Sequence, residues 1–264
     1  MKNITLYHNG PSTCSQKVRL ILELKKIKYK SELIDLFTGE QHSPEYVKLN
    51  PNHLVPTLVV DNNILLESSL INEYLEDTFP EVSARPADSF RIHQMRLWIK
   101  YVDIYHSQCG SLTYGIGMRN ILNQKPKEEV NKEINAIPDL IKRKNRRDLV
   151  DLGIEAPIFI EALRQSNIFL NKLEQSLGTS EWIYNDSFGL ADASALPYII
   201  RMEQLALSDL FNNRPKINAW YTKIKKMDIY QKAVTAFIPQ PLIDYLYQCG
   251  EDQKDKIFKL LEKN

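Results

Sequence analysis

The first 80 residues alternate short apolar stretches with segments whose apolar positions recur at helical spacing. The stretch ITLYH at 4–8 predicts a strand, and CSQKVRLILELKK at 14–26 predicts an amphipathic helix. A strand at 29–35 and a helix at 43–50 follow, then two strands at 56–60 and 64–68 around a DNN turn, and a helix at 68–79. The pattern therefore predicts an α/β domain of the order βαβαββα.

The chain changes character after the segment PEVSARPAD at 80–88, because long helical patterns replace strands. Helices are predicted at 88–123, 126–137, 157–176 and 189–205, and over most of 214–262. We therefore predict an α/β domain at 1–80, a linker at 81–88 and an all-helical domain at 89–264.

Composition narrows the class of protein and of partner. With 43% hydrophobic and 25% charged residues, the chain has the composition of a soluble globular protein. Its net charge of +1 provides no global field for nucleic acid or an anionic membrane, and no apolar run approaches the length of a membrane span. Three distant cysteines, Cys14, Cys109 and Cys249, form neither a disulfide framework nor a zinc motif. We expect a cytoplasmic protein without a metal.

The segment NGPSTCSQKVRL at 9–20 places four nucleophile-type side chains in a row, where a strand gives way to a helix. Helical spacing puts Cys14 on the same face as Val18 and Ile21. This spacing predicts that Cys14 points into the core as a small hydrophobe, rather than outward as a reactive thiol.

Several motifs together resemble the glutathione transferase family. STCSQKVRL is similar to the zeta-type opening in which a serine begins the first helix, NPNHLVPTL at 50–58 to the cis-proline segment, and ESSLINEYLED at 67–77 to the γ-glutamyl-binding helix. RPAD, MRLWIKYVDIY and a late NAIP followed by a basic run are similar to phrases of the bacterial β-aryl etherase branch. The resemblance implies that 1–80 is a thioredoxin-like domain binding glutathione as co-substrate. It also implies a homodimer and a helical domain that binds a small hydrophobic electrophile.

The resemblance assigns the serine that begins the first helix a hydrogen bond to the glutathione sulfur. Lowering a thiol pKa by about 2 from its usual ~8.5 requires roughly 2.7 kcal/mol, which a hydroxyl donor at a helix N-terminus can supply. Ser12 is the first candidate and Ser15 the second, with Thr13 and Cys14 as alternates. Redox-active relatives carry C-x-x-C where Ser12 and Ser15 stand, so dithiol exchange is not expected.

Other residues are assigned to glutathione by position. Ser68 and the N–H groups of the following helical turn would bind the γ-glutamyl carboxylate and Glu67 the amine, unless Ser68 only caps the helix. In the segment Leu54, Val55 and Pro56, the Val55 backbone would pair with the cysteinyl part before a cis proline. Loop residues Gln41 and His53 would reach the glycyl end, or would simply be solvated.

The helical half is expected to supply the electrophile pocket. Trp98, Tyr101, Tyr105 and His106 recur at a spacing of three or four residues, which is also typical of a helix core. Tyr101, Tyr105 and Tyr114 are the predicted pocket residues.

Two further features of this half have structural interpretations. The basic run KRKNRR at 142–147 is interpreted as a solvated helix end rather than a nucleic-acid site. Asp192 is assigned to folding, and Gly189 before it replaces the serine or threonine that the family shows.

The leading hypothesis is a glutathione transferase with a role in detoxification, in which the glutathione thiolate attacks a small hydrophobic electrophile. Cleavage of a β-aryl ether is one version of that reaction, and isomerisation and dehalogenation are others. Two alternatives differ in class. The first alternative is a non-catalytic transferase-like module for protein contacts. The second is a thiol transferase or reductase that works through Cys14.

Overall fold

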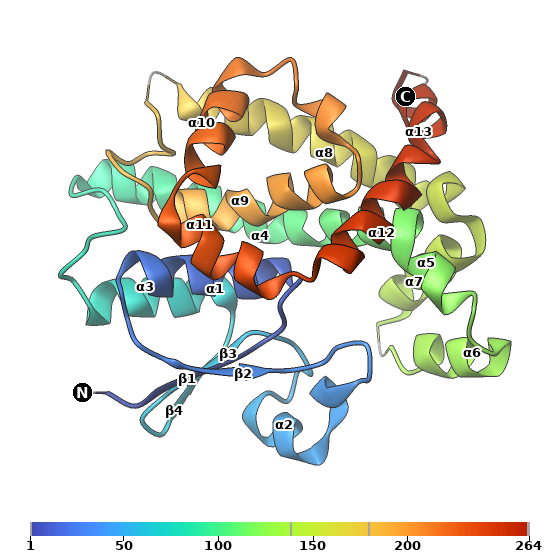
Figure 1. Ribbon diagram of the computed structural model, residues 1–264, viewed down its shortest axis with the longest axis horizontal. Coiled ribbons are helices and arrows are strands. Elements are labelled where there is room, and N and C mark those ends of the chain that lie inside the picture. The colour runs from blue at the N-terminus through green and yellow to red at the C-terminus, as the bar shows by residue number, and fades with distance from the viewer. Residues whose placement is uncertain (1, 138, 179, 263–264) are drawn as a thin grey trace. The chain divides into compact units, whose positions relative to one another are not determined.

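The computed structural model describes residues 2–137, 139–178 and 180–262 (Figure 1). Pro138, the last residue of the NAIP phrase, lies outside them. By packing, the chain divides into two compact units. The first holds the chain up to Asp103 with Ser176–Pro197 and Lys216–Pro239; the second holds Ile104–Gln175, Tyr198–Pro215 and the chain from Gln240 onward. The predicted domain and linker bounds separate the α/β part of the chain from the all-helical part, whereas the two units are defined by packing. Those bounds therefore stay a prediction.

The first unit contains a four-stranded sheet in the order β2-β1-β3-β4. Strands β1 and β2 are parallel, whereas β3 runs antiparallel to both β1 and β4. The elements follow in the order β1 (Ile4–His8), α1 (Thr13–Leu24), β2 (Lys30–Leu33), α2 (Pro44–Leu49), β3 (Thr57–Val60), β4 (Asn63–Leu65) and α3 (Ser68–Thr78). This order confirms the predicted βαβαββα thioredoxin-like fold.

Local sequence explains where these elements begin. β1 alternates buried and half-buried positions, as a strand covered more closely on one face does. Ser43 caps α2 by accepting a hydrogen bond from the Tyr46 N–H, and Pro44 occupies its first turn, where no intrahelical donor is needed. In Figure 1, α1 and α3 lie on one side of the sheet and α2 lies on the other.

A buried ion pair joins the C-terminal end of α1 to the C-terminal part of α3. Lys25 Nζ lies 2.6 Å from Glu76 Oε2, and the two side chains are 1% and 4% exposed. Lys25 also donates to the carbonyls of Phe79 and Val82, while Glu76 accepts from the Ala84 N–H. This network ties the two helices to the segment that follows α3.

Later segments complete the first unit. Helix α9 (Leu190–Gln204) starts there, where buried Asp192 accepts hydrogen bonds from the N–H groups of Gly189 and Ile183 and from Trp220 Nε1. Burial raises the pKa of the Asp192 carboxyl to about 7. A Cβ atom at Gly189 would lie 2.4 Å from the Ala84 carbonyl oxygen, so this close approach accounts for glycine at the cap. Helices α10 (Pro215–Lys225), α11 (Asp228–Ala233) and the 3₁₀ turn η5 (Thr235–Phe237) follow, and α11 packs on α1.

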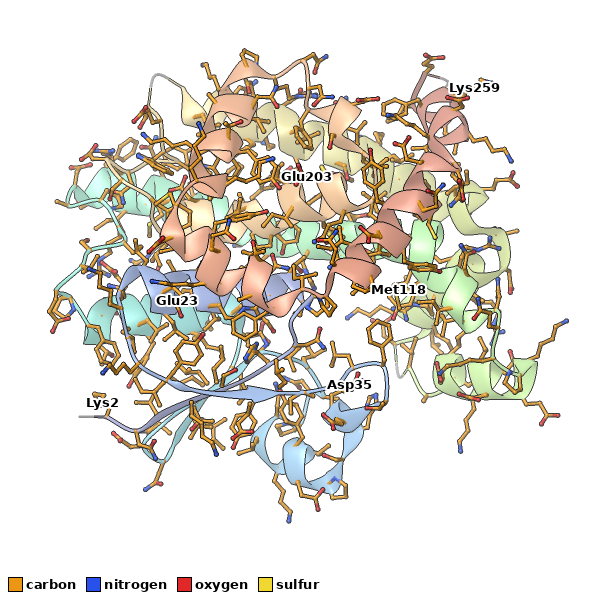
Figure 2. All side chains as sticks on the ribbon, in the orientation of Figure 1. Lys2, Glu23, Asp35, Met118, Glu203 and Lys259 are labelled. Carbon is orange, nitrogen blue, oxygen red and sulfur yellow. The ribbon has the colours of Figure 1, made fainter. Side chains whose placement is uncertain are left out.

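The second unit is helical in its described residues. The pattern at 88–123 forms α4 (Ser89–Thr113), whose residues from Ile104 onward belong to this unit, a π-helical segment η2 (Tyr114–Met118) and α5 (Arg119–Leu122). The Ile116 and Gly117 carbonyls within η2 accept hydrogen bonds from Gln253 Nε2 and Tyr245 Oη. Figure 2 labels Met118, the last residue of η2. The other helices are α6 (Lys127–Asn135), α7 (Leu140–Leu152), α8 (Pro157–Leu177), α12 (Gln240–Glu251) and α13 (Lys254–Glu262).

Over the described ranges, no helix has both the length and the apolar character that crossing a membrane would require.

Candidate functional site

Ser12 stands at the N-cap of α1 and is half-buried. Its backbone is extended, with φ −61° and ψ 124°, and its Oγ accepts a hydrogen bond from the Ser15 N–H at 3.2 Å. A serine hydroxyl holds one proton in addition to its acceptor lone pairs. Because the helix uses Oγ as an acceptor, the hydroxyl proton stays available for a ligand atom at the helix N-terminus.

Ser15, the second candidate for the thiol contact, is not accessible in the structure. Its side chain is 0% exposed, and its Oγ accepts a hydrogen bond from the Asn9 N–H at 3.2 Å. A side chain without exposed surface cannot touch a ligand that arrives from solvent. The assignment of Ser15 to the thiol is therefore corrected: it links α1 to the loop before it.

Cys14, which was predicted to be a core residue, is not fully buried. Cys14 is half-buried, whereas every residue from Ser15 to Leu22 is buried. Counting along one helical face assumes that the opposite face is solvated, and α1 is covered on all sides over that stretch. Cys14 lies one residue before this covered stretch. Of the four residues in the row, only Ser12 and Cys14 keep substantial exposed surface.

The Val55–Pro56 peptide bond is cis, which confirms the prediction. The Leu54 carbonyl before it accepts hydrogen bonds from Tyr46 Oη at 2.6 Å and from Asn50 Nδ2 at 2.8 Å. Within the described part of the chain, no hydrogen bond engages the N–H or the carbonyl of Val55. The Val55 backbone can therefore accept an extended peptide as an added strand.

Ser68 is the first residue of α3 and is 8% exposed. The cap position belongs to Glu67, which has φ +65°, is exposed and forms no side-chain cap hydrogen bond. The structure therefore excludes the alternative that Ser68 only caps the helix. Because the first turn of α3 has no side-chain cap, its N–H groups can bind a carboxylate, with the Ser68 hydroxyl beside them.

Gln41 and His53 lie together, as the glycyl-end assignment requires, and His42 joins them. Gln41 Nε2 lies 3.1 Å from His42 Nε2, and His42 Nδ1 lies 3.0 Å from His53 Nδ1. The Gln41 Oε1 atom is buried and has no hydrogen-bond partner among the described residues. Sequence reasoning missed His42, although it directly follows Gln41 in the same polar loop.

Behind the loop of Ser12, His8 is buried and contacts Arg19 Nη1 through its Nδ1 atom at 2.9 Å. Burial and the Arg19 charge lower the pKa of His8 to about 3, so the ring is neutral at physiological pH. A guanidinium can only donate, so Nδ1 accepts and the proton of the neutral ring is on Nε2, 2.7 Å from Ser31 Oγ. Neither residue was assigned a role from the sequence, although a charged residue within the apolar run VRLIL was a signal.

The predicted electrophile-pocket residues have different environments. Tyr105 is 3% exposed, stacks on Phe169 with ring centroids 4.4 Å apart, and is hydrogen-bonded to Ser166 Oγ at 2.7 Å. It is a core residue, so its assignment to the pocket is corrected. The aromatic spacing on α4 reflects packing at this position. Tyr101 and Tyr114 are half-buried and stay predictions.

The basic run at 142–147 lies in the first half of α7. Its arginines contact neighbouring segments: Arg143 donates to the Ile137 carbonyl, Arg147 to Asn131 Oδ1, and the Arg146 guanidinium lies 3.4 Å from the Tyr114 ring centroid. The run is therefore partly structural rather than only a solvated helix end. Within the described ranges, no three His, Cys, Asp or Glu side chains are grouped to hold a metal ion.

Comparison with known proteins finds relatives of this chain. The family model described as "Glutathione S-transferase, N-terminal domain" matches residues 11–78. Protein LigF of Sphingobium sp. strain SYK-6 is 29% identical over 249 residues, which cover 87% of this chain and 97% of LigF. The crystal structure titled beta-etherase LigF superposes with a TM-score of 0.78 at 27% identity, covering 88% of this chain and 98% of that one. Residues 11–78 thus match the N-terminal domain of glutathione S-transferases, and the chain is similar to LigF over most of its length.

An isomerase is also similar to part of this chain. The maleylacetoacetate isomerase of Dictyostelium discoideum is 46% identical over 87 residues, which cover 32% of this chain and 40% of the isomerase. The family match at 11–78 spans Ser12, Val55 and Ser68. The match therefore covers the residues that the structure leaves open to a ligand.

Proposed function

We propose that the protein is a glutathione transferase in which Ser12 stabilises the thiolate of bound glutathione. The observation that carries the proposal is the state of the Ser12 hydroxyl, which the helix uses as an acceptor and which retains exposed surface. The hydroxyl proton and the positive end of the α1 dipole would act together on the sulfur. Two charge-assisted interactions of this kind supply about 2–3 kcal/mol, enough to lower the thiol pKa by about 2.

Support for glutathione as the co-substrate comes from polar groups that suit each part of the tripeptide. The Val55 N–H and carbonyl match the amide groups of the cysteinyl residue, and the start of α3 with Ser68 matches the γ-glutamyl carboxylate. Exposed Glu67 provides an acceptor for the α-amine, and Gln41 and His53 provide donors for the glycyl carboxylate. Each charged or polar end of the tripeptide thus has a chemically suitable partner.

The reaction in this proposal is a nucleophilic substitution on a small hydrophobic electrophile. The thiolate sulfur forms a bond to an electrophilic carbon, and the leaving group departs with the electron pair and takes up a proton. Cleavage of an aryl ether is the version that similarity to LigF supports, with an aryloxide as the leaving group. Similarity to the isomerase supports isomerisation as a different reaction, in which the thiolate adds to an electrophilic carbon and is later expelled, so that no other group leaves. A cytoplasmic, detoxifying role belongs to the same proposal, in keeping with three cysteines that are thiols rather than disulfides.

The exposure of Cys14 supports a second candidate function. Cys14 is the second residue of α1, and a helix N-terminus lowers the pKa of a thiol and makes it more nucleophilic. Cys14 would then attack a mixed disulfide of glutathione. One sulfur–sulfur bond would form at Cys14 as another breaks, and a second glutathione would restore the thiol.

One experiment separates these functions. Glutathione binding, conjugation to an activated aryl halide and reduction of a glutathione mixed disulfide are measured for the native protein, Ser12→Ala and Cys14→Ala. We expect Ser12→Ala to retain binding and to lose about a hundredfold in conjugation rate, and Cys14→Ala to stay within about twofold of native. Disulfide reduction that only Cys14→Ala abolishes would establish the second function instead. Binding without either activity would indicate the non-catalytic module, and no binding at millimolar glutathione would refute the proposal.

A homodimer is part of the proposal. Helices α3 and α4 are joined by Arg96, which donates two hydrogen bonds to Glu73. Exposed apolar side chains lie on the same two helices, with Leu70 66% exposed, Phe90 66% and Leu97 54%. A second copy of the chain would cover them. Light scattering coupled to size exclusion should give a dimer for the native protein and for the control Ile141→Glu, and a monomer for Leu97→Glu. A monomeric native protein would contradict the proposed homodimer.

A further inference from the structure

Arg19, in the middle of α1, is 0% exposed and holds several segments together. Its Nε donates to the Ala233 carbonyl at 2.6 Å, Nη1 to the Asn9 carbonyl at 3.1 Å, and Nη2 to the Gly10 carbonyl at 2.8 Å. The guanidinium carbon also lies 4.5 Å from the ring centroid of Phe237. One side chain thus connects the loop before α1 with the segment of α11 and η5, more than 200 residues later in the chain.

The loop that Arg19 holds is the one that places Ser12. The Asn9 carbonyl that accepts from Arg19 also accepts from the Ser12 N–H at 3.3 Å. The Asn9 N–H donates to Ser15 Oγ, and the Ser15 N–H donates to Ser12 Oγ. Asn9, Ser15 and Ser12 therefore form a closed set of hydrogen bonds, and the guanidinium holds this set from behind.

The late segment approaches the loop without an intervening side chain. A Cβ atom at Gly10 would lie 2.0 Å from the Phe237 carbonyl oxygen, so any other residue would force the two backbones apart. Gly10 is two residues before Ser12 in the chain. A displacement of η5 would therefore reach Ser12 both through the backbone contact at Gly10 and through Arg19.

Fold stability alone explains Arg19 poorly. Its hydrogen-bond acceptors are neutral, namely three carbonyl groups and the His8 ring, and among the described residues no carboxylate pairs with it. Burial lowers the pKa of Arg19 only to about 10, so the group stays charged at neutral pH. A buried charge without a counter-ion is costly, and apolar side chains in such places are often as stable or more so. Accurate placement of three backbone carbonyls is what the guanidinium fork provides.

We propose that Arg19 is a positioning residue for Ser12. Through its contacts with Arg19, the Asp228–Phe237 segment would also help to position the part of the site that binds the glutathione thiol. This inference rests on the proposed function of Ser12. Arg19 does not itself touch glutathione; it fixes the direction of the Ser12 hydroxyl. Its loss should therefore change the acidity of the bound thiol more than the affinity for the tripeptide.

The test titrates the thiol of bound glutathione through the ultraviolet absorbance of the thiolate. It compares the native protein, Arg19→Lys, Ser12→Ala and the double variant, each at saturating glutathione. Arg19→Lys should raise the pKa of the bound thiol by about 0.5 or more, which lowers the ratio of thiolate to thiol roughly threefold at a given pH. In the Ser12→Ala background the same substitution should cause no further shift, because the two residues act as one unit.

Two more variants guard against a general loss of folding. Arg201→Lys replaces another buried arginine, which contacts Thr113 and Gln204 in the second unit, and should leave the pKa of the bound thiol unchanged. Phe237→Leu removes the ring beside the guanidinium and should shift the pKa in the same direction as Arg19→Lys, by less. If Arg19→Lys does not fold, the pKa of the bound thiol in Phe237→Leu tests the inference instead.

The outcomes separate the inference from the proposed function. A raised pKa in Ser12→Ala with none in Arg19→Lys and Phe237→Leu overturns the inference alone. A shift from Arg19→Lys that persists in the Ser12→Ala background also overturns it, since Arg19 would then act independently of Ser12. An unchanged pKa in Ser12→Ala overturns the role of Ser12 and the inference together.

Discussion

Helices α1 and α3 pack against each other and share the Lys25–Glu76 ion pair, yet their N-termini are built in opposite ways. The start of α1 is satisfied internally, because Ser12 caps it and Arg19 holds the loop before it. The start of α3 is left open, with Glu67 at the cap position, φ +65° and no side-chain cap. Under the proposed function, the protein saturates its own hydrogen bonds where the reacting sulfur must be placed accurately, and it leaves donors unused where the carboxylate of glutathione would bind.

The largest expected effect comes from breaking the ion pair that the two helices share. Glu76→Ala leaves Lys25 buried without its counter-ion and should lower the free energy of unfolding by about 3–5 kcal/mol, as measured in urea. Asp77→Ala is the matched control, because Asp77 is 62% exposed in its pair with Arg85 and should cost at most about 1 kcal/mol. Equal losses in the two variants would show that the ion pair does not hold the helices together.

The next effect tests the open helix start. Ser68→Ala should weaken glutathione binding about tenfold, by roughly 1.4 kcal/mol, and leave the pKa of the bound thiol unchanged. Ser69→Ala is the control, since Ser69 donates to Asp103 rather than facing the proposed ligand. Isothermal calorimetry measures both variants. Similar affinities for Ser68→Ala and native protein would remove Ser68 from the site.

Glu67→Gly should separate stability from binding. Glycine adopts φ +65° without strain, so the unliganded variant should be more stable than native by about 1 kcal/mol or less. Loss of the carboxylate should nevertheless weaken glutathione binding. Lys26, just after the C-terminus of α1, has a similar φ of +56°. Lys26→Gly is the control and should increase stability without affecting glutathione binding. If Glu67→Gly binds glutathione as tightly as the control, the amine contact is refuted.

The smallest effect is the contribution of buried His8 to the pH dependence of stability. The folded state holds His8 neutral, with a pKa of about 3 against 6.5 in the unfolded chain. The unfolded state therefore binds a proton more readily, and this contribution to stability is complete above pH 6.5 and lost as pH falls toward 3. Between pH 7.5 and pH 6, native protein should lose about 0.8 kcal/mol more than His8→Gln. Exposed His93→Gln should behave like native protein in the same urea titrations. Parallel pH dependence in His8→Gln and native protein would refute a neutral buried ring.

Much of the first unit was predictable because its signals are local. Alternating apolar residues mark β1, Ser43 and Pro44 mark the start of α2, and the NPNHLVPTL motif indicated the cis peptide bond at Pro56. Burial was less predictable. Cys14 and Ser15 exchange their expected exposures because α1 is covered on all sides, and Tyr105 packs in the core although its spacing also fits a pocket.

The sequence by itself determined the order of elements, the family resemblance and the positions of Ser12, Val55 and Ser68, because helix caps, turns and motifs depend on neighbours in the chain. Only the tertiary structure decided which two residues of STCS keep exposed surface, that Gln41, His42 and His53 meet, and that Arg19 links Asn9 to Ala233. These facts depend on contacts between residues far apart in the chain. No periodicity within one segment encodes what another segment will cover.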